Sequence, residues 1–139
     1  MKGIFVDTAG WMACADEGDP AHAVSRQARD LSLEQGNVLV ATDYVIDETM
    51  TLIRIRLGLA AAKLWWEQLV GSSRLRWEWI GMERAEKARK AFFRHRDKTY
   101  SFSDCTSLVV MQELKLKNVL TTDHHFRQMG FQVLPRIIG

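Results

Sequence analysis

The sequence predicts an α/β protein with a parallel sheet. Short apolar runs recur along the chain, and longer segments whose apolar residues repeat at helical spacing separate them. Strands that alternate with helices form parallel βαβ units with right-handed crossovers. The first run, Gly3 to Val6, ends directly in Asp7. The carboxyl end of a strand is where such sheets bind ligands, so this stretch is the first place to look for chemistry.

Five segments fit strands. Four are short runs rich in branched apolar residues. The third alternates instead, with Leu75, Trp77 and Trp79 on one face and charged residues on the other, which is typical of a half-exposed strand at a sheet edge. The predicted strands are residues 3–6, 38–41, 74–80, 119–120 and 131–134.

Helices are predicted between these strands from caps, terminating glycines and apolar rows. Asp7 or Thr8 caps the first helix, and Asp19 followed by Pro20 is a typical start for the second. The expected apolar rows of later helices include Ile46 and Ile53, Ala62 and Trp66, Ala88 and Phe92, and Leu108 and Met111, and that of the second helix is Ala21, Val24, Ala28 and Leu31. The predicted helices are residues 8–15, 20–35, 43–57, 59–70, 83–96, 103–117 and 123–129.

Composition bounds the class of protein. A chain of 139 residues, 47% hydrophobic, is long enough for one domain with its own core, so residues 1–139 are expected to form a single domain. The net charge of +2 is weak evidence about partners. Cys14 and Cys105 lack the spacing of a zinc site or a disulfide framework, and we expect buried thiols. No signal peptide or long apolar span is recognisable, which predicts a soluble cytoplasmic protein with no membrane contact.

Four acids lie directly after predicted strands or near the apolar faces of predicted helices: Asp7, Glu48, Asp104 and Asp123. Each has an ordinary explanation when taken alone. Asp7 and Asp123 can cap the turns that follow them, and Glu48 can be a solvated helix residue. Asp104 completes a capping box with Ser101.

Taken together the ordinary explanations are weaker. Asp7 and Asp123 each follow a strand, so parallel strands bring them to the same edge. Asp104 and Glu48 lie on or beside the apolar faces of their helices, where an unpaired acid is costly. No Lys or Arg in these segments is spaced to neutralise them. A divalent cation would, and oxygen ligands favour Mg²⁺ or Mn²⁺, which support displacement at phosphorus.

The same residues resemble a known family. Phe5-Val6-Asp7-Thr8, Asp47-Glu48-Thr49, Ser101 to Cys105 and Leu120 to Phe126 look like the successive motifs of the PIN-domain nucleases, with the VapC-type toxins of toxin–antitoxin pairs as the closest likeness. The resemblance covers essentially the whole chain. It implies a five-stranded parallel sheet in the order 3-2-1-4-5, flanked by helices.

The resemblance also implies a function. The acidic quartet would bind Mg²⁺ or Mn²⁺, with Asp7 and Asp104 as the direct ligands and Glu48 and Asp123 as supporting acids. The implied activity is endoribonuclease cleavage of RNA, with tRNA or rRNA as common targets. A cognate antitoxin that covers the groove near the helix pair after the second strand, and a homodimer, are the implied partners.

Two other function classes share features with this sequence. A non-catalytic PIN-like module that binds RNA or protein is the alternative, although such modules tend to lose their acids. A phospho-receiver domain needs an acceptor Asp at the end of a middle strand and a Lys at the end of the last one, and the strand ends near Ile80 and Leu134 offer neither.

Several residues near these motifs have two interpretations. Thr8 and Thr122 can orient a carboxylate or simply satisfy a turn, and His124 and His125 are expected to be exposed residues of a helical turn rather than ligands or bases. Asp43 and Asp47 are additional acids, of which Asp47 is expected to point away. Arginines and lysines can line an RNA path or a solvated face, and the tryptophans favour core or interface roles: Arg54, Arg56, Arg94, Arg96, Lys98, Trp65, Trp66, Trp77 and Trp79.

Overall fold

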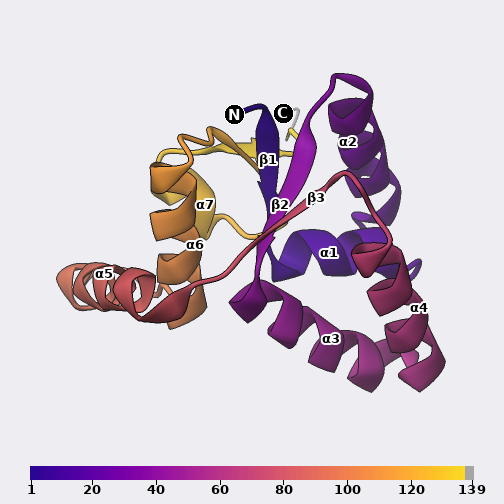
Figure 1. Ribbon diagram of the computed structural model, residues 1–139, viewed down its shortest axis with the longest axis horizontal. Coiled ribbons are helices and arrows are strands. Elements are labelled where there is room, and N and C mark those ends of the chain that lie inside the picture. The colour runs from indigo at the N-terminus through magenta and orange to yellow at the C-terminus, as the bar shows by residue number, and fades with distance from the viewer. Residues whose placement is uncertain (137–139) are drawn as a thin grey trace.

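The computed structural model describes residues 1–136 and contains one parallel sheet of five strands in the order β3-β2-β1-β4-β5. The predicted fold class and strand order are therefore confirmed. β1 lies in the centre and β3 and β5 form the edges (Figure 1). The strands are β1 (Gly3–Val6), β2 (Val38–Thr42), β3 (Leu75–Glu78), β4 (Asn118–Leu120) and β5 (Gln132–Leu134).

Helices flank the sheet on both sides. Figure 1 shows α5, α6 and α7 on one side of the strands and α1 and α2 on the other, while α3 and α4 pack together beyond the end of β2. The helices are α1 (Thr8–Ala15), α2 (His22–Glu34), α3 (Asp43–Leu57), α4 (Leu59–Val70), α5 (Gly81–Arg94), α6 (Phe102–Glu113) and α7 (His125–Gln128).

The central strand and its neighbours form the main core. All four residues of β1 are buried, and Phe5, Val40 and Val119 on adjacent strands have no exposed surface. Burying a side chain of this size contributes roughly 1.5–3 kcal/mol. Because strands of α/β sheets are covered on both faces, they are continuous apolar runs rather than alternating ones, which is why the sequence identified them.

The first turn of α1 lies very close to the end of β4. A Cβ built on Gly10 would overlap the carbonyl oxygen of Leu120 and crowd the Val6 side chain. Only glycine therefore fits at this position. The close approach brings the residue before α1, Asp7, beside the segment that follows β4.

The buried face of α2 differs from the predicted one. Val24 and Leu31 are 48% and 54% exposed, whereas Ser25 and Ser32 are buried. Small side chains let the helix approach the sheet closely, and the Ser32 hydroxyl donates to the Ala28 carbonyl. The larger apolar residues of the row consequently face outward.

The start of α2 and the facing residue of α4 were also predicted incorrectly. The Asp19 carboxylate accepts the Ala21 N–H in a separate turn, so α2 begins only at His22. In α4, Trp65 packs edge-on against Trp11 with ring centroids 5.6 Å apart, while Trp66 is exposed.

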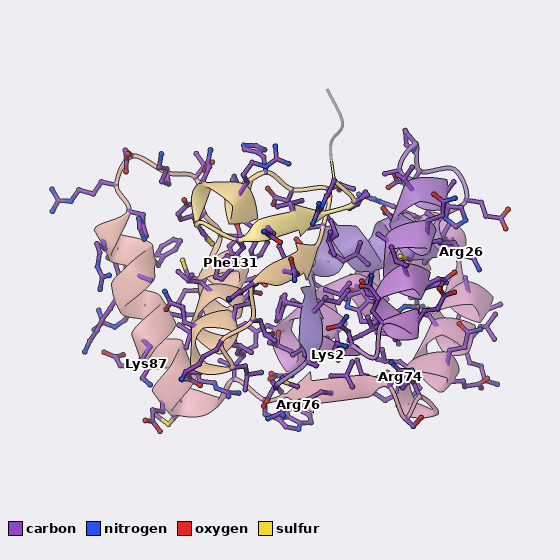
Figure 2. The ribbon with its side chains drawn as sticks, turned by 90° about the horizontal axis from the view of Figure 1, so that it is seen from above. Lys2, Arg26, Arg74, Arg76, Lys87 and Phe131 are labelled. Atoms are coloured by element: carbon purple, nitrogen blue, oxygen red, sulfur yellow. The ribbon has the colours of Figure 1, made fainter. Side chains whose placement is uncertain are left out.

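The edge strand β3 is held by an arginine that precedes it. The Arg74 guanidinium donates to the carbonyls of Leu33 and Asn37, at 2.8 and 2.6 Å. These bonds tie the start of β3 to the turn between α2 and β2 (Figure 2). Leu75 and Trp77 are half-buried and Arg76 is exposed, which confirms the edge strand over Leu75–Glu78. The predicted alternation fails beyond Trp77, because Glu78 is half-buried and Trp79 is exposed after the strand has ended.

Two expectations from composition can be compared with the structure. Cys14 and Cys105 are free and buried, as expected. Among residues 1–136, every helix is too short or too polar to cross a bilayer.

Candidate active site

The structure brings the four predicted acids to one cavity at the carboxyl edge of the sheet. Asp7, Glu48, Asp104 and Asp123 all line this hollow, which has a volume of about 360 Å³. They come from the junction of β1 and α1, from α3, from α6 and from the segment after β4. Asp47 lies outside this cavity, in a neighbouring hollow that it shares with Glu48.

Asp7 is the most deeply buried of the acids. It caps α1: its Oδ1 accepts the Gly10 N–H at 2.8 Å, and its Oδ2 accepts the Thr121 hydroxyl at 2.7 Å. The pKa of Asp7 is raised from 3.8 to about 7. Burial is the main cause, the two hydrogen bonds oppose the shift, and the charges of Asp123 and Asp104 add to it. Asp7 therefore sits where a negative charge is costly unless a cation lies nearby.

Thr121 links two of the acids, a role that the sequence did not predict for it. Its buried hydroxyl donates to Asp7 and accepts the Asp123 N–H at 2.9 Å. Its own N–H donates to the Leu134 carbonyl, so it still pairs as part of the sheet. The predicted residue, Thr122, is exposed, although it also lines the cavity.

Asp104 has both of the roles considered for it in the sequence. It forms a capping box at the start of α6, where Ser101 Oγ accepts the Asp104 N–H and Asp104 Oδ2 accepts the Ser101 N–H. It also lines the cavity. The cap fixes the position of the carboxylate on the first turn of the helix.

His125 joins the acidic cluster, contrary to expectation. Its side chain is only 17% exposed, with Nδ1 3.0 Å from Asp104 Oδ2 and 3.3 Å from Asp123 Oδ1. Its backbone N–H donates to Asp123 Oδ1, and its Nε2 contacts the Thr99 hydroxyl. The tight turn into α7 directs the ring inward. The prediction of an exposed residue holds for His124 alone.

The donor set fits a cation. One ligand atom each from Asp104, Asp123 and His125 lies within 4.8 Å of the others, and Asp7 and Glu48 line the same cavity. Among residues 1–136, no Lys or Arg makes an ion pair with any of the four acids, as the sequence predicted. Carboxylate oxygens are the ligands that hard divalent cations prefer. The cluster is compatible with a metal site.

One cationic side chain reaches this cavity without pairing with an acid. Arg56, near the end of α3, is exposed and contributes to the lining. It was among the residues considered for an RNA path, and its place beside the acids favours contact with an anionic substrate over a purely solvated role.

Comparison with known proteins agrees with this architecture. The model of the PIN domain family matches residues 4–132, almost the whole chain. The chain belongs to the PIN domain family. The family predicted from the four motifs is therefore confirmed.

A characterised relative has a similar sequence and structure. This PIN domain is 32% identical over 132 residues to the 23S rRNA-specific endonuclease VapC20 of Mycobacterium tuberculosis, recorded for two strains, covering 92% of this chain and 95% of the relative. The crystal structure of VapC20, described as a toxin that cleaves the sarcin–ricin loop, matches with a TM-score of 0.82 and 31% identity over 93% of this chain and 96% of that one.

A more distant structure shares the fold alone. The crystal structure of FitAcB from Neisseria gonorrhoeae matches this PIN domain with a TM-score of 0.61 and 13% identity, over 94% of this chain and 95% of that chain. A likeness at this identity extends the fold comparison without bearing on substrate.

Proposed function

We propose that this PIN domain is a metal-dependent endoribonuclease and the toxin of a toxin–antitoxin pair. The observation that carries the proposal is the convergence of Asp7, Glu48, Asp104 and Asp123 on one cavity without a Lys or Arg partner in the described chain. Acids that converge without cationic partners lower stability, so their value lies in binding a cation. The similarity to an rRNA endonuclease supports the same conclusion.

The proposed roles of the four acids are those that the family resemblance implies. Asp7 and Asp104 act as direct ligands of Mg²⁺ or Mn²⁺, and Glu48 and Asp123 support the ion or its water. The bound ion would activate a water and stabilise the oxygens of an in-line displacement at phosphorus. Thr121 holds Asp7 and the backbone of Asp123 in register, and His125 holds the carboxylates of Asp104 and Asp123 close together.

The raised pKa of Asp7 is a consequence of the same arrangement. With a pKa of about 7, a substantial fraction of the carboxyl groups carries a proton at neutral pH in the metal-free protein. Ligands of a divalent cation must be deprotonated, so binding of the ion releases that proton and strengthens as pH rises. Burial of the Asp7 carboxyl group thus has two effects: it raises the pKa in the metal-free protein, and it makes binding of a cation favourable.

The substrate and partners are proposed by analogy with the relative. The expected substrate is the sarcin–ricin loop of 23S rRNA, the target that the description of VapC20 gives. Arg56 would contact a phosphate of that RNA at the cavity. A cognate antitoxin, a homodimer and action in the cytoplasm complete the proposal.

The test is cleavage of a defined RNA. The purified protein is incubated with a hairpin RNA of the sarcin–ricin loop sequence and Mg²⁺ or Mn²⁺, and products are mapped on a gel. We expect cleavage at one position, with Asp7→Asn and Asp104→Asn inactive and still folded. Asp47→Asn, next to Glu48 but outside the cavity, is the matched control and should cut normally. Full activity in excess chelator, or in the Asp7→Asn or Asp104→Asn variant, would falsify the mechanism.

A further inference from the structure

A second hollow adjoins the acidic cavity and is not explained by the metal site. It has a volume of about 310 Å³ and shares Thr122 and Asp123 with the acidic cavity. It lies between the start of α2 and the ends of β4 and β5. The other residues that line it are Ala21, Val24, Thr121, His124, Arg127, Val133, Pro135 and Arg136.

This hollow combines apolar walls with a cationic rim. Val24, Val133 and Pro135 form apolar parts of the wall, and Val24 leaves 48% of its surface exposed although it borders a concave site. Arg127 and Arg136 are exposed, and neither makes an ion pair with another residue of the described range 1–136. The acidic cavity has the opposite charge character, because several of the residues that line it are acids.

We propose that this hollow binds one nucleotide of the RNA, next to the bond that is cut. The proposal rests on the proposed ribonuclease function. The base would lie against Val24 and Val133, and Arg127 and Arg136 would contact the flanking phosphates. Single-stranded RNA is recognised through splayed-out bases held on apolar or planar groups beside a cationic path. The volume lies within the range of roughly 300–1,000 Å³ typical of small-ligand pockets.

Its position favours RNA over a protein segment. An RNA strand whose cut phosphate lies beside Asp123 must continue over the surface on either side of that residue. The hollow begins at Asp123, and the guanidinium groups on its rim match a polyanion. A mainly acidic peptide would satisfy the guanidinium groups but would have no phosphodiester to place at the proposed metal site next to them.

The first experiment fills the hollow. Val24→Trp places a large ring in it, and Leu31→Trp is the matched control: Leu31 is on the same outward row of α2, equally exposed, and does not line the hollow. Both changes are made in a cleavage-deficient Asp104→Asn parent. Affinity for a fluorescein-labelled sarcin–ricin hairpin is measured by anisotropy. We expect Val24→Trp to weaken binding by about tenfold, the order of one lost base contact, and Leu31→Trp to leave it unchanged.

The second experiment identifies the base. Each nucleotide around the cleavage position is replaced in turn by an abasic one. One replacement should weaken binding to the parent by about tenfold and have no further effect on Val24→Trp, because the filled hollow has already lost that base. Additive losses at every position would contradict the proposal.

The third experiment removes a cation. Arg127→Gln should lower the slope of log affinity against log salt by about 0.7, the value for one phosphate contact in a single strand. Arg26→Gln, also an exposed arginine and on α2 away from the hollow, should leave the slope unchanged (Figure 2).

The outcomes separate this inference from the ribonuclease assignment. Binding that depends on Val24 and Arg127 in a protein that never cuts RNA would reject the ribonuclease assignment and keep the nucleotide site. Normal cutting with Val24→Trp and Arg127→Gln indistinguishable from their controls would reject the nucleotide site and leave the hollow to a protein partner. Failure of the parent to bind the hairpin or an unstructured RNA would reject it as well.

Discussion

Two groups of acids in this protein are treated in opposite ways. Glu78 and Glu113, on β3 and α6, surround Arg84: its guanidinium lies 3.3 Å from Glu78 and 2.9 Å from Glu113, and Lys87 adds a third contact. Partial burial works against ionisation, yet the hydrogen bonds from Arg84 and Lys87 hold the pKa of Glu113 below its usual value. Both acids are already paired with an arginine.

Within residues 1–136, the acids at the carboxyl edge have no Lys or Arg partner, and His125 is the basic side chain that contacts Asp104 and Asp123. The pKa of Asp7 is raised to about 7, mainly by burial and in smaller part by its acidic neighbours. The two groups of acids differ in whether an arginine or lysine lies beside them, and the carboxyl groups themselves are the same. Acids paired with arginine stabilise the surface by a small amount, whereas acids grouped without a cation cost stability and keep a site ready for a ligand.

The largest expected effect comes from removing one of the acids of the cavity. Asp104→Asn should lower the rate of RNA cleavage by at least about 100-fold, since it removes a proposed direct ligand, and loss of even an outer partner of a metal ligand costs about 10–100-fold. Glu113→Gln, an acid on the same helix with an arginine partner, is the control and should keep the full rate. Single-turnover cleavage of the hairpin measures both.

The next effect concerns stability and pH. The pKa of Asp7 in the folded protein, about 7, lies above the ordinary Asp value of 3.8. The protonated Asp7 side chain therefore contributes stability that is complete below about pH 4 and is lost as pH rises through about 7. In metal-free protein at pH 8, Asp7→Asn should raise the free energy of unfolding by on the order of 2 kcal/mol. Denaturation in urea with chelator measures it, and an equal gain at pH 4 would contradict the explanation.

A smaller effect sharpens the role of the linking threonine. Thr121→Val removes the hydroxyl that donates to Asp7 and accepts from Asp123, and should lower the cleavage rate by about tenfold, the lower end for loss of a supporting partner. Thr121→Ser should restore most of the rate. Thr122→Val, which changes the exposed neighbour, should have the weaker effect of the two, and the reverse order would argue against the assignment.

The smallest effect tests the paired acids. Glu113→Gln should lower the free energy of unfolding by only about 0.5 kcal/mol, because the ion pairs it makes are partly exposed. The loss should shrink in 1 M salt, where exposed charges are screened. Thermal denaturation at low and high salt is sufficient, and a salt-independent loss would point to packing instead.

Much of the architecture was predictable from sequence because it depends on patterns within single segments. Continuous apolar runs identified the strands, the alternation around Trp77 identified the edge strand, and the acids at strand ends identified the cavity. The strand order came from the family resemblance and is matched by the structure.

The misses have a common cause, which is contact between distant segments. Thr121 and Thr122 look alike in sequence, and only the pairing of Thr121 with β5 shows which hydroxyl meets Asp7. His125 was expected at the surface because nothing local shows that α7 turns its ring toward α6. The outward row of α2 was misassigned because Ser25 and Ser32 pack where larger residues would be expected.

Gly10 has a practical consequence for handling a protein of this kind. Its contact with the Leu120 carbonyl couples the two halves of the acidic cavity, although the residue has no side chain and donates only its N–H to Asp7. Gly10→Ala would force those halves apart while leaving every carboxylate in the sequence. It is therefore the natural choice for a temperature-sensitive allele, with which cells could be grown at a restrictive temperature and the enzyme switched on by cooling.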